Sequence, residues 1–188
     1  MQSVAVYCGA NKGNQPYFAE AATELGQTLA QRGIQIVYGG GSVGLMGVLA
    51  DAALAAGGKV RGIITHQLNN LELGHPEVEE MLVVESMSER RSLLLHGTDG
   101  VITMPGGYGS MDEIFEALTL AQLHQYPHPI GLLNVRGYYD PLLAMLDNMV
   151  EFGFLKPQNR GLCIVAPTVP ELLDKMAQYQ YDPIGKWV

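Results

Sequence analysis

The segment Asp99–Glu116 constrains the fold most, because a short apolar run leads through a glycine-rich turn into a helical pattern. Residues 100–104 predict a buried strand, and the helical pattern begins near Ser110. Three glycines in the turn allow positive φ and leave no side chain to block a ligand. Ser110, followed three residues later by Glu113, predicts an N-cap and capping box. Because a helix N-terminus presents free N–H groups, the turn is expected to hold an anion.

Short apolar runs alternate with helical patterns along the rest of the chain. Strands are expected at residues 3–7, 34–38, 60–64, 81–84, 100–104, 129–133 and 163–165. Helices are expected at about 16–32, 86–96, 110–123, 138–151 and from residue 170 onward, and a further helix is expected after the glycine-rich segment 39–47, running to about residue 56. Such alternation predicts an α/β, Rossmann-like three-layer fold, with a mostly parallel sheet of about seven strands covered by helices on both faces.

The domain organisation predicted from this pattern is simple. Residues 1–181 are expected to form a single nucleotide-binding domain, followed by a loosely held tail, 182–188. The polar segment Thr65–Pro76 is expected to form a loop beside the site.

Four marked turns follow predicted strands: Cys8–Asn11, Gly39–Gly44, Glu85–Arg91 and Pro105–Ser110. Ligands of open α/β sheets bind at the carboxyl ends of the strands. We therefore expect these four turns to form one site.

Composition excludes several classes of function. The 188 residues carry a net charge of −8, which gives no basic footprint for nucleic acid. No apolar run approaches the ~20 residues of a membrane span, and no signal peptide is evident. Two cysteines favour a reducing cytoplasm over a disulfide framework. Charged residues are only 16% of the chain, and the helix around Phe115–Leu123 carries many apolar residues. Together these two observations predict a homodimer.

The glycines at 39, 41 and 44 match the dinucleotide-binding fingerprint G-x-G-x-x-G after a predicted strand. The acidic residue that would hold a cofactor ribose is missing, since the next strand ends at Gly62–Thr65. An NAD- or FAD-dependent oxidoreductase is therefore disfavoured, and no Gly-Lys-Ser/Thr follows to make a P-loop. A phosphate cradle at the helix N-terminus and a tight turn without ligand both stay open.

A carboxylate and guanidinium groups are predicted at the same sheet edge. Glu113 beside Arg90 and Arg91, near a bound phosphate ester, suits cleavage of a glycosidic bond through an oxocarbenium-like transition state. The alternatives are that Glu113 only caps its helix and that the arginines lie on a solvated face. Asp112 lies about 100° around the helix from Glu113, so the two are expected to have separate tasks.

Neither a metal nor a cofactor is expected. The five histidines show no metal-ligand spacing, and Cys8 has no histidine placed to activate it. No lysine falls at a predicted strand end facing the site, which argues against a pyridoxal phosphate Schiff base.

With these residues assembled, the sequence resembles the Lonely Guy (LOG) family, the cytokinin riboside 5′-monophosphate phosphoribohydrolases. Residues 105–113, Pro-Gly-Gly-Tyr-Gly-Ser-Met-Asp-Glu, match PGGxGTxxE with Ser for Thr. Residues 37–41, 44–47, 131–134 and 137–139 match further family motifs, and the likeness covers about residues 3–165.

The resemblance implies a Rossmann-like homodimer that hydrolyses the N-glycosidic bond of cytokinin riboside 5′-monophosphate or AMP to free base and ribose 5-phosphate. The family's catalytic residues fall on Arg90 and Glu113. Its substrate and phosphate contacts fall on Gly40, Gly41, Met87, Arg91, Gly107, Gly109 and Ser110. A nucleotide-binding protein without turnover is the alternative on the same turns.

Several positions depart from the family pattern. Ser88 replaces a histidine, and Arg91 replaces a lysine, which keeps the charge but changes its shape. Ala10 and Asn11 replace two serines, and Ala10 removes a hydroxyl near the expected sugar. Some family members have been labelled lysine decarboxylases, and the missing pyridoxal phosphate lysine argues against that label.

Overall fold

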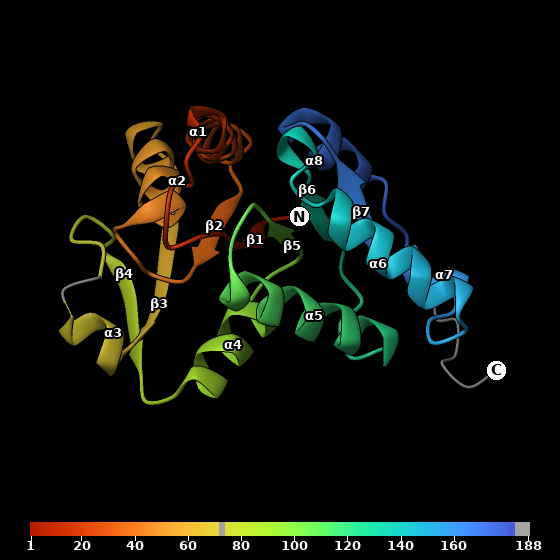
Figure 1. Ribbon diagram of the computed structural model, residues 1–188. Helices are drawn as coiled ribbons and strands as arrows, with labels where there is room; N and C mark the ends of the chain where they lie inside the picture. The colour runs from red at the N-terminus through yellow and green to blue at the C-terminus, as the bar shows by residue number, and fades with distance from the viewer. Residues whose placement is uncertain (72–73, 183–188) are drawn as a thin grey trace.

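Seven parallel strands form one sheet in the order β4-β3-β2-β1-β5-β6-β7 (Figure 1). The structure, a computed structural model, describes residues 1–71 and 74–182. The strands are β1 Ser3–Tyr7, β2 Gln35–Tyr38, β3 Val60–Thr65, β4 Glu80–Val84, β5 Val101–Thr103, β6 Ile130–Leu133 and β7 Cys163–Ala166. The strand order reverses between β1 and β5, which is the switch point where α/β sheets bind ligands.

Helices cover both faces of this sheet (Figure 1). Helices α1, α2 and α8 lie on one face, and α4, α5 and α6 lie on the other. The helices are α1 Pro16–Gln31, α2 Gly44–Ala55, α3 His66–Asn70, α4 Met87–His96, α5 Tyr108–Gln122, α6 Asp140–Glu151, α7 Pro157–Arg160 and α8 Val169–Ala177, with a 3₁₀ turn, η1, at Val135–Gly137. The predicted three-layer α/β fold is confirmed.

Both faces of the strands are buried, which explains why they read as continuous apolar runs. In β1, Val4 and Val6 pack with α1 and α2, whereas Ala5 and Tyr7 pack with α4 and α5. The carboxyl ends of the central strands therefore lie between two sets of helices.

The expected loop at residues 65–76 is wrong in part, because it contains helix α3. The Thr65 hydroxyl caps this helix by accepting a hydrogen bond from the Leu68 N–H at 3.4 Å. Helix α7 was likewise not expected from the sequence. The predicted tail, 182–188, lies outside the described residues apart from Asp182.

Helix α5 begins two residues earlier than expected, at Tyr108, with Gly107 as its N-cap. The predicted N-cap role of Ser110 is therefore wrong. A serine N-cap is found instead on α4, where the Ser86 hydroxyl accepts from the Glu89 N–H at 3.1 Å. The Glu89 carboxylate in turn accepts from the Glu85 N–H at 3.1 Å.

No helix in residues 1–71 and 74–182 has both the length and the apolar character required to cross a membrane.

Candidate active site

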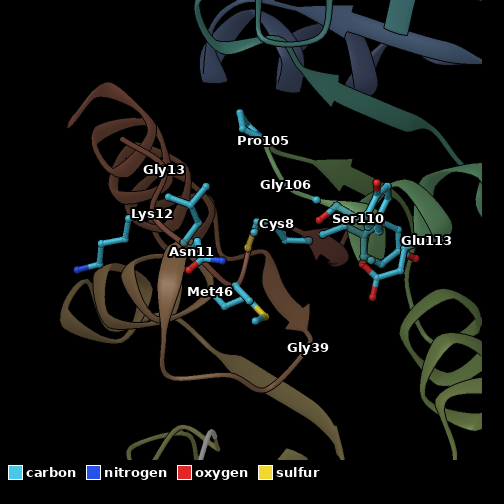
Figure 2. Close-up of a pocket in the computed structure, with 18 of the residues that line it drawn as sticks. Cys8, Asn11, Lys12, Gly13, Gly39, Met46, Pro105, Gly106, Ser110 and Glu113 are labelled. Atoms are coloured by element: carbon cyan, nitrogen blue, oxygen red, sulfur yellow. The ribbon is translucent and has the colours of Figure 1, made fainter. Parts of the chain in front are cut away.

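A cavity of about 530 Å³ opens at the carboxyl ends of β1, β2 and β5 (Figure 2). Its volume falls in the range typical of small-molecule sites. Each of the four turns predicted at the strand ends contributes to its lining. Figure 2 shows Ser110 and Glu113 on one side of the cavity and the turn with Asn11 and Lys12 on the other.

Arg90 and Glu113 form an ion pair at the wall of this cavity. Nη1 of Arg90 lies 3.3 Å from Oε1 of Glu113, and the two side chains are 9% and 12% exposed. Nε of Arg90 donates to the Ile63 carbonyl at 2.9 Å, and Nη2 donates to the Gly39 carbonyl at 3.1 Å. The guanidinium is thus held in one orientation by the carboxyl ends of β2 and β3.

Gly39 makes room for this arginine. A Cβ on Gly39 would overlap Nη2 of Arg90. The first glycine of the G-x-G-x-x-G pattern therefore accommodates a protein side chain, rather than the close approach of a dinucleotide.

The pKa of Glu113 is raised to about 7, mainly by burial, and the nearby Asp112 carboxylate also contributes to raising it. The guanidiniums of Arg90 and Arg91 act in the opposite direction and lower it. A carboxyl group that titrates near neutral pH is suited to proton transfer or to stabilising a developing positive charge.

The first turn of α5 presents unpaired backbone N–H groups beside Glu113. Helix geometry leaves the N–H groups of Tyr108, Gly109 and Ser110 without partners inside the helix. The Ser110 side chain is buried and occupies the space that a Cβ on Gly106 would need. The turn is consequently closed down tightly against the helix N-terminus, where an anion would bind.

Five predicted site residues lie together, and four lie elsewhere. The cavity is lined by Arg90, Gly107, Gly109, Ser110 and Glu113. The lining does not include Gly40, Gly41, Met87 or Arg91.

Those four residues have other surroundings. Gly40, at φ +75°, packs towards Met81 and Ile64, and Gly41 forms an isolated bridge with Gly74. Met87 is exposed at the start of α4.

Arg91 contacts the outer side of α5. Its Nη1 lies 3.1 Å from Oδ2 of Asp112, and its Nε lies 3.1 Å from Oε2 of Glu116. These contacts place it in a separate groove with Phe115. Asp112 and Glu113 therefore have different partners, in line with the separate tasks expected for them.

Sequence reasoning missed several lining residues, among them Phe18, Met46 and Tyr138. Phe18 lies on α1, and no spacing links it to the glycine turn, whereas Met46 lies on α2 within the matched motif at 44–47. Tyr138 likewise belongs to a matched motif, at 137–139, and its hydroxyl donates to the Gly106 carbonyl at 2.7 Å.

The thiol of Cys8 also lines this cavity. Burial raises the pKa of the Cys8 thiol far above its usual range, so it does not supply a thiolate nucleophile. Within the described parts of the chain, no three His, Cys, Asp or Glu side chains gather in a way that could hold a metal ion.

Comparison with known proteins identifies the family. Residues 46–176 match a family model described as "possible lysine decarboxylase". The chain is 47% identical over 176 residues to the probable cytokinin riboside 5′-monophosphate phosphoribohydrolase LOGL1 of Oryza sativa subsp. japonica, covering 94% of this chain and 79% of the relative. The chain belongs to the LOG family.

Further comparisons agree with this membership. The LOG-family protein is 41% identical over 177 residues to the cytokinin riboside 5′-monophosphate phosphoribohydrolase LOG5 of Arabidopsis thaliana, covering 94% of this chain and 78% of the relative. Its fold matches the molybdenum cofactor carrier protein of Chlamydomonas reinhardtii with a TM-score of 0.69 at 20% identity, over 94% and 96% of the two chains. The resemblance read from the sequence motifs is confirmed.

Proposed function

We propose that this LOG-family chain hydrolyses the N-glycosidic bond of nucleoside 5′-monophosphates, either cytokinin riboside 5′-monophosphate or AMP. The products are the free base and ribose 5-phosphate. The names of relatives at 41–47% identity support the reaction. The observation that carries the proposal is the buried Arg90–Glu113 pair, 3.3 Å apart, beside the open helix N-terminus of α5.

The phosphate binds at the first turn of α5, where the N–H groups of Tyr108, Gly109 and Ser110 point along the helix axis. The sugar then extends into the cavity towards Glu113, which lies one helical turn further along the same helix. This arrangement uses the phosphate to place the ribose C1′ beside the carboxylate.

Glu113 acts on the reacting carbon. As the bond from C1′ to the base nitrogen breaks, its electron pair leaves with the base and positive charge develops on the sugar. The Glu113 carboxylate stabilises that charge and assists a water molecule, whose oxygen bonds to C1′. Overall, the water also supplies the proton that the departing base gains.

Arg90 has two roles in this scheme. Its bonds to the Gly39 and Ile63 carbonyls hold it in place, and its Nη1 orients the Glu113 carboxylate. Its guanidinium also lowers the pKa of Glu113 against the effect of burial, which favours the ionised form. We propose separately that four further residues contact the substrate, although they do not line this cavity: Gly40, Gly41, Met87 and Arg91.

The direct test is to incubate the purified chain with AMP and with N6-isopentenyladenosine monophosphate, and to measure base and ribose 5-phosphate. We expect equal amounts of the two products. Glu113→Gln and Arg90→Ala should each lower kcat by roughly 10²–10⁴-fold while the circular dichroism spectrum is retained. Unchanged turnover in either variant removes that residue from the mechanism.

The second candidate is a nucleotide-binding protein without turnover. It is favoured by one observation, that the same fold occurs in a protein named as a molybdenum cofactor carrier. Binding of AMP by calorimetry without release of ribose 5-phosphate would establish this candidate in place of hydrolysis.

We also propose that the chain is a single domain over residues 1–181 that works as a cytoplasmic homodimer. One continuous sheet supports the single domain, and the free thiols of Cys8 and Cys163 suit a reducing compartment. Exposed apolar side chains on α4 and α5 support the dimer.

A further inference from the structure

A tightly built turn, residues 134–139, leads into α6 and faces the glycine turn of the site at residues 105–110. Arg136 and Gly137 both adopt left-handed backbone conformations, with φ of 52° and 75°. The Asn134 side chain closes the turn: its Oδ1 accepts from the Tyr139 N–H at 2.7 Å, and its Nδ2 donates to Asp140 at 2.8 Å. A strained segment that is held this firmly is a candidate for a functional role.

The turn aims two consecutive tyrosines at the backbone of the glycine turn. The Tyr138 hydroxyl donates to the Gly106 carbonyl at 2.7 Å, and the Tyr139 hydroxyl donates to the Met104 carbonyl at 2.6 Å. The carbonyl between them, that of Pro105, accepts from the Gly9 N–H at 3.0 Å. Three successive carbonyls are therefore bound by groups from outside the turn.

This arrangement matters because an anion site needs N–H groups, and not carbonyl oxygens, directed at the ligand. Glycine has little preference among backbone conformations, so the peptide units around Gly106 and Gly107 have low intrinsic resistance to rotation. A peptide that rotates would direct a carbonyl oxygen at the phosphate. Bonds that hold the carbonyls elsewhere prevent this rotation.

We infer that Tyr138 and Tyr139 are positioning residues that fix the glycine turn in its anion-binding orientation. The inference rests on the proposed function and extends it, since it names what holds the phosphate site in shape. Neither tyrosine needs to contact the substrate phosphate for this role. Each acts through a carbonyl oxygen of the turn.

The two tyrosines differ in their surroundings, and this makes them separable by experiment. Tyr139 is buried, and loss of its hydroxyl would leave the buried Met104 carbonyl without that donor. Tyr138 is 44% exposed, and its ring packs edge-on against Phe18 at a centroid distance of 5.6 Å. Tyr138→Phe therefore removes one hydroxyl at the cavity edge and keeps the ring contact.

The test measures binding of ribose 5-phosphate and of adenosine, which lacks the phosphate, by isothermal titration calorimetry. For Tyr138→Phe we expect affinity for ribose 5-phosphate to fall about 5–10-fold, the usual effect of one hydrogen bond. Affinity for adenosine should be unchanged. In AMP hydrolysis, KM should rise by a similar factor with kcat unchanged, since only uniform binding is lost.

Tyr17→Phe is the matched control, because Tyr17 belongs to the same aromatic cluster and packs against Phe18 at 4.6 Å but does not line the cavity. It should bind both ligands as the unchanged chain does. Tyr139→Phe should weaken ribose 5-phosphate binding and also lower the melting temperature.

Unchanged ribose 5-phosphate affinity in Tyr138→Phe, or an equal loss for adenosine, overturns the inference. The calorimetry does not depend on turnover. If the unchanged chain releases no ribose 5-phosphate from AMP but the selective loss is seen, the inference stands and the proposed hydrolysis fails. If AMP is hydrolysed and Tyr138→Phe has an unchanged KM, the proposed hydrolysis stands and the inference fails.

Discussion

At the scale of single residues, Glu113 is governed by two opposing effects. Burial favours its neutral form, and the guanidinium of Arg90 favours its ionised form. Burial is the larger effect, so the pKa is raised from 4.5 to about 7. The ionised carboxylate that the proposed chemistry uses is therefore held at a cost to stability.

The first prediction concerns pH and stability. Because the folded-state pKa lies above the unfolded one, ionised Glu113 destabilises the fold, progressively between pH 4.5 and about 7. Glu113→Gln should remove this loss, so the variant should gain about 3 kcal/mol relative to the unchanged chain between those pH values. Urea unfolding at several pH values measures the difference. A constant difference across the range would contradict the assignment.

The second prediction concerns pH and rate. If ionised Glu113 is required, kcat/KM for AMP should rise with pH and level off above an apparent pKa of about 7. Arg90→Lys keeps a positive charge but loses the fixed fork of donors. In this variant the rise of kcat/KM should therefore occur at higher pH. A profile that is flat from pH 5 to 9 would exclude this role.

The third prediction concerns Gly39. In Gly39→Ala the new Cβ would displace the Arg90 guanidinium, so kcat should fall about 100-fold and the unfolding free energy by about 1–3 kcal/mol. Gly97→Ala is the control, because its nearest neighbour is the Leu93 carbonyl oxygen at 3.4 Å. In an Arg90→Ala background, Gly39→Ala should cost little more. A full additional loss there would mean that Gly39 acts independently of Arg90.

At the scale of elements, helix α4 carries Arg90 at the end of its first turn. The bonds that the Ser86 and Glu89 side chains make to backbone N–H groups fix where this helix starts, and hence where the arginine lies. Helix capping thereby contributes to the geometry of the site.

The fourth prediction tests that contribution. Ser86→Ala should lower the unfolding free energy by about 1 kcal/mol and should also lower kcat. Ser88→Ala alters an exposed serine on the same turn and should change neither. Ser86→Asp should keep the unfolding free energy and the kcat of the unchanged chain, since aspartate caps helices equally well. Stability measured by denaturant and turnover of AMP decide the outcome.

The strands could be predicted from the sequence because both faces of the sheet are buried, which produces apolar runs. The short helices α3 and α7 could not, because five and four residues are too few to show helical periodicity. The pattern Ser-x-x-Glu occurs at 86–89 and again at 110–113, and only at the first does the serine cap a helix. At the second, Ser110 packs over Gly106 inside a helix that has already begun.

The site could be placed from the turns at the strand ends, and the Arg90–Glu113 pair was among its predicted residues. What the sequence did not reveal is the function of each neighbour. Gly39 leaves space for the Arg90 guanidinium, and Arg91 pairs with Asp112 on the outer side of α5. The Tyr138 hydroxyl donates to the Gly106 carbonyl. These roles depend on side-chain directions that local spacing does not encode.

At the scale of the whole molecule, exposed apolar side chains are distributed unevenly over the two helical layers. The layer of α4, α5 and α6 and the segments after them expose Met87, Leu93, Phe115, Leu123, Met145, Phe152 and Phe154. Among the described residues, the layer of α1, α2 and α8 and its flanking segments contribute Val43, just before α2, and Tyr181, after α8. Such asymmetry is typical of a surface that another chain covers.

The fifth prediction is that the chain forms a dimer through the α4–α5 layer. Light scattering at micromolar concentration should give twice the 20.3 kDa mass of one chain. Phe115→Glu places a charge on this layer, and in a two-fold symmetric interface it would do so twice, so the variant should be monomeric. Ala55→Glu makes the same charge change on α2, on the opposite face, and should stay dimeric. A monomeric unchanged chain would rule out the dimer. A Phe115→Glu variant that keeps the double mass would place the contact elsewhere, because a buried unpaired carboxylate is too costly for an interface of ordinary size to retain.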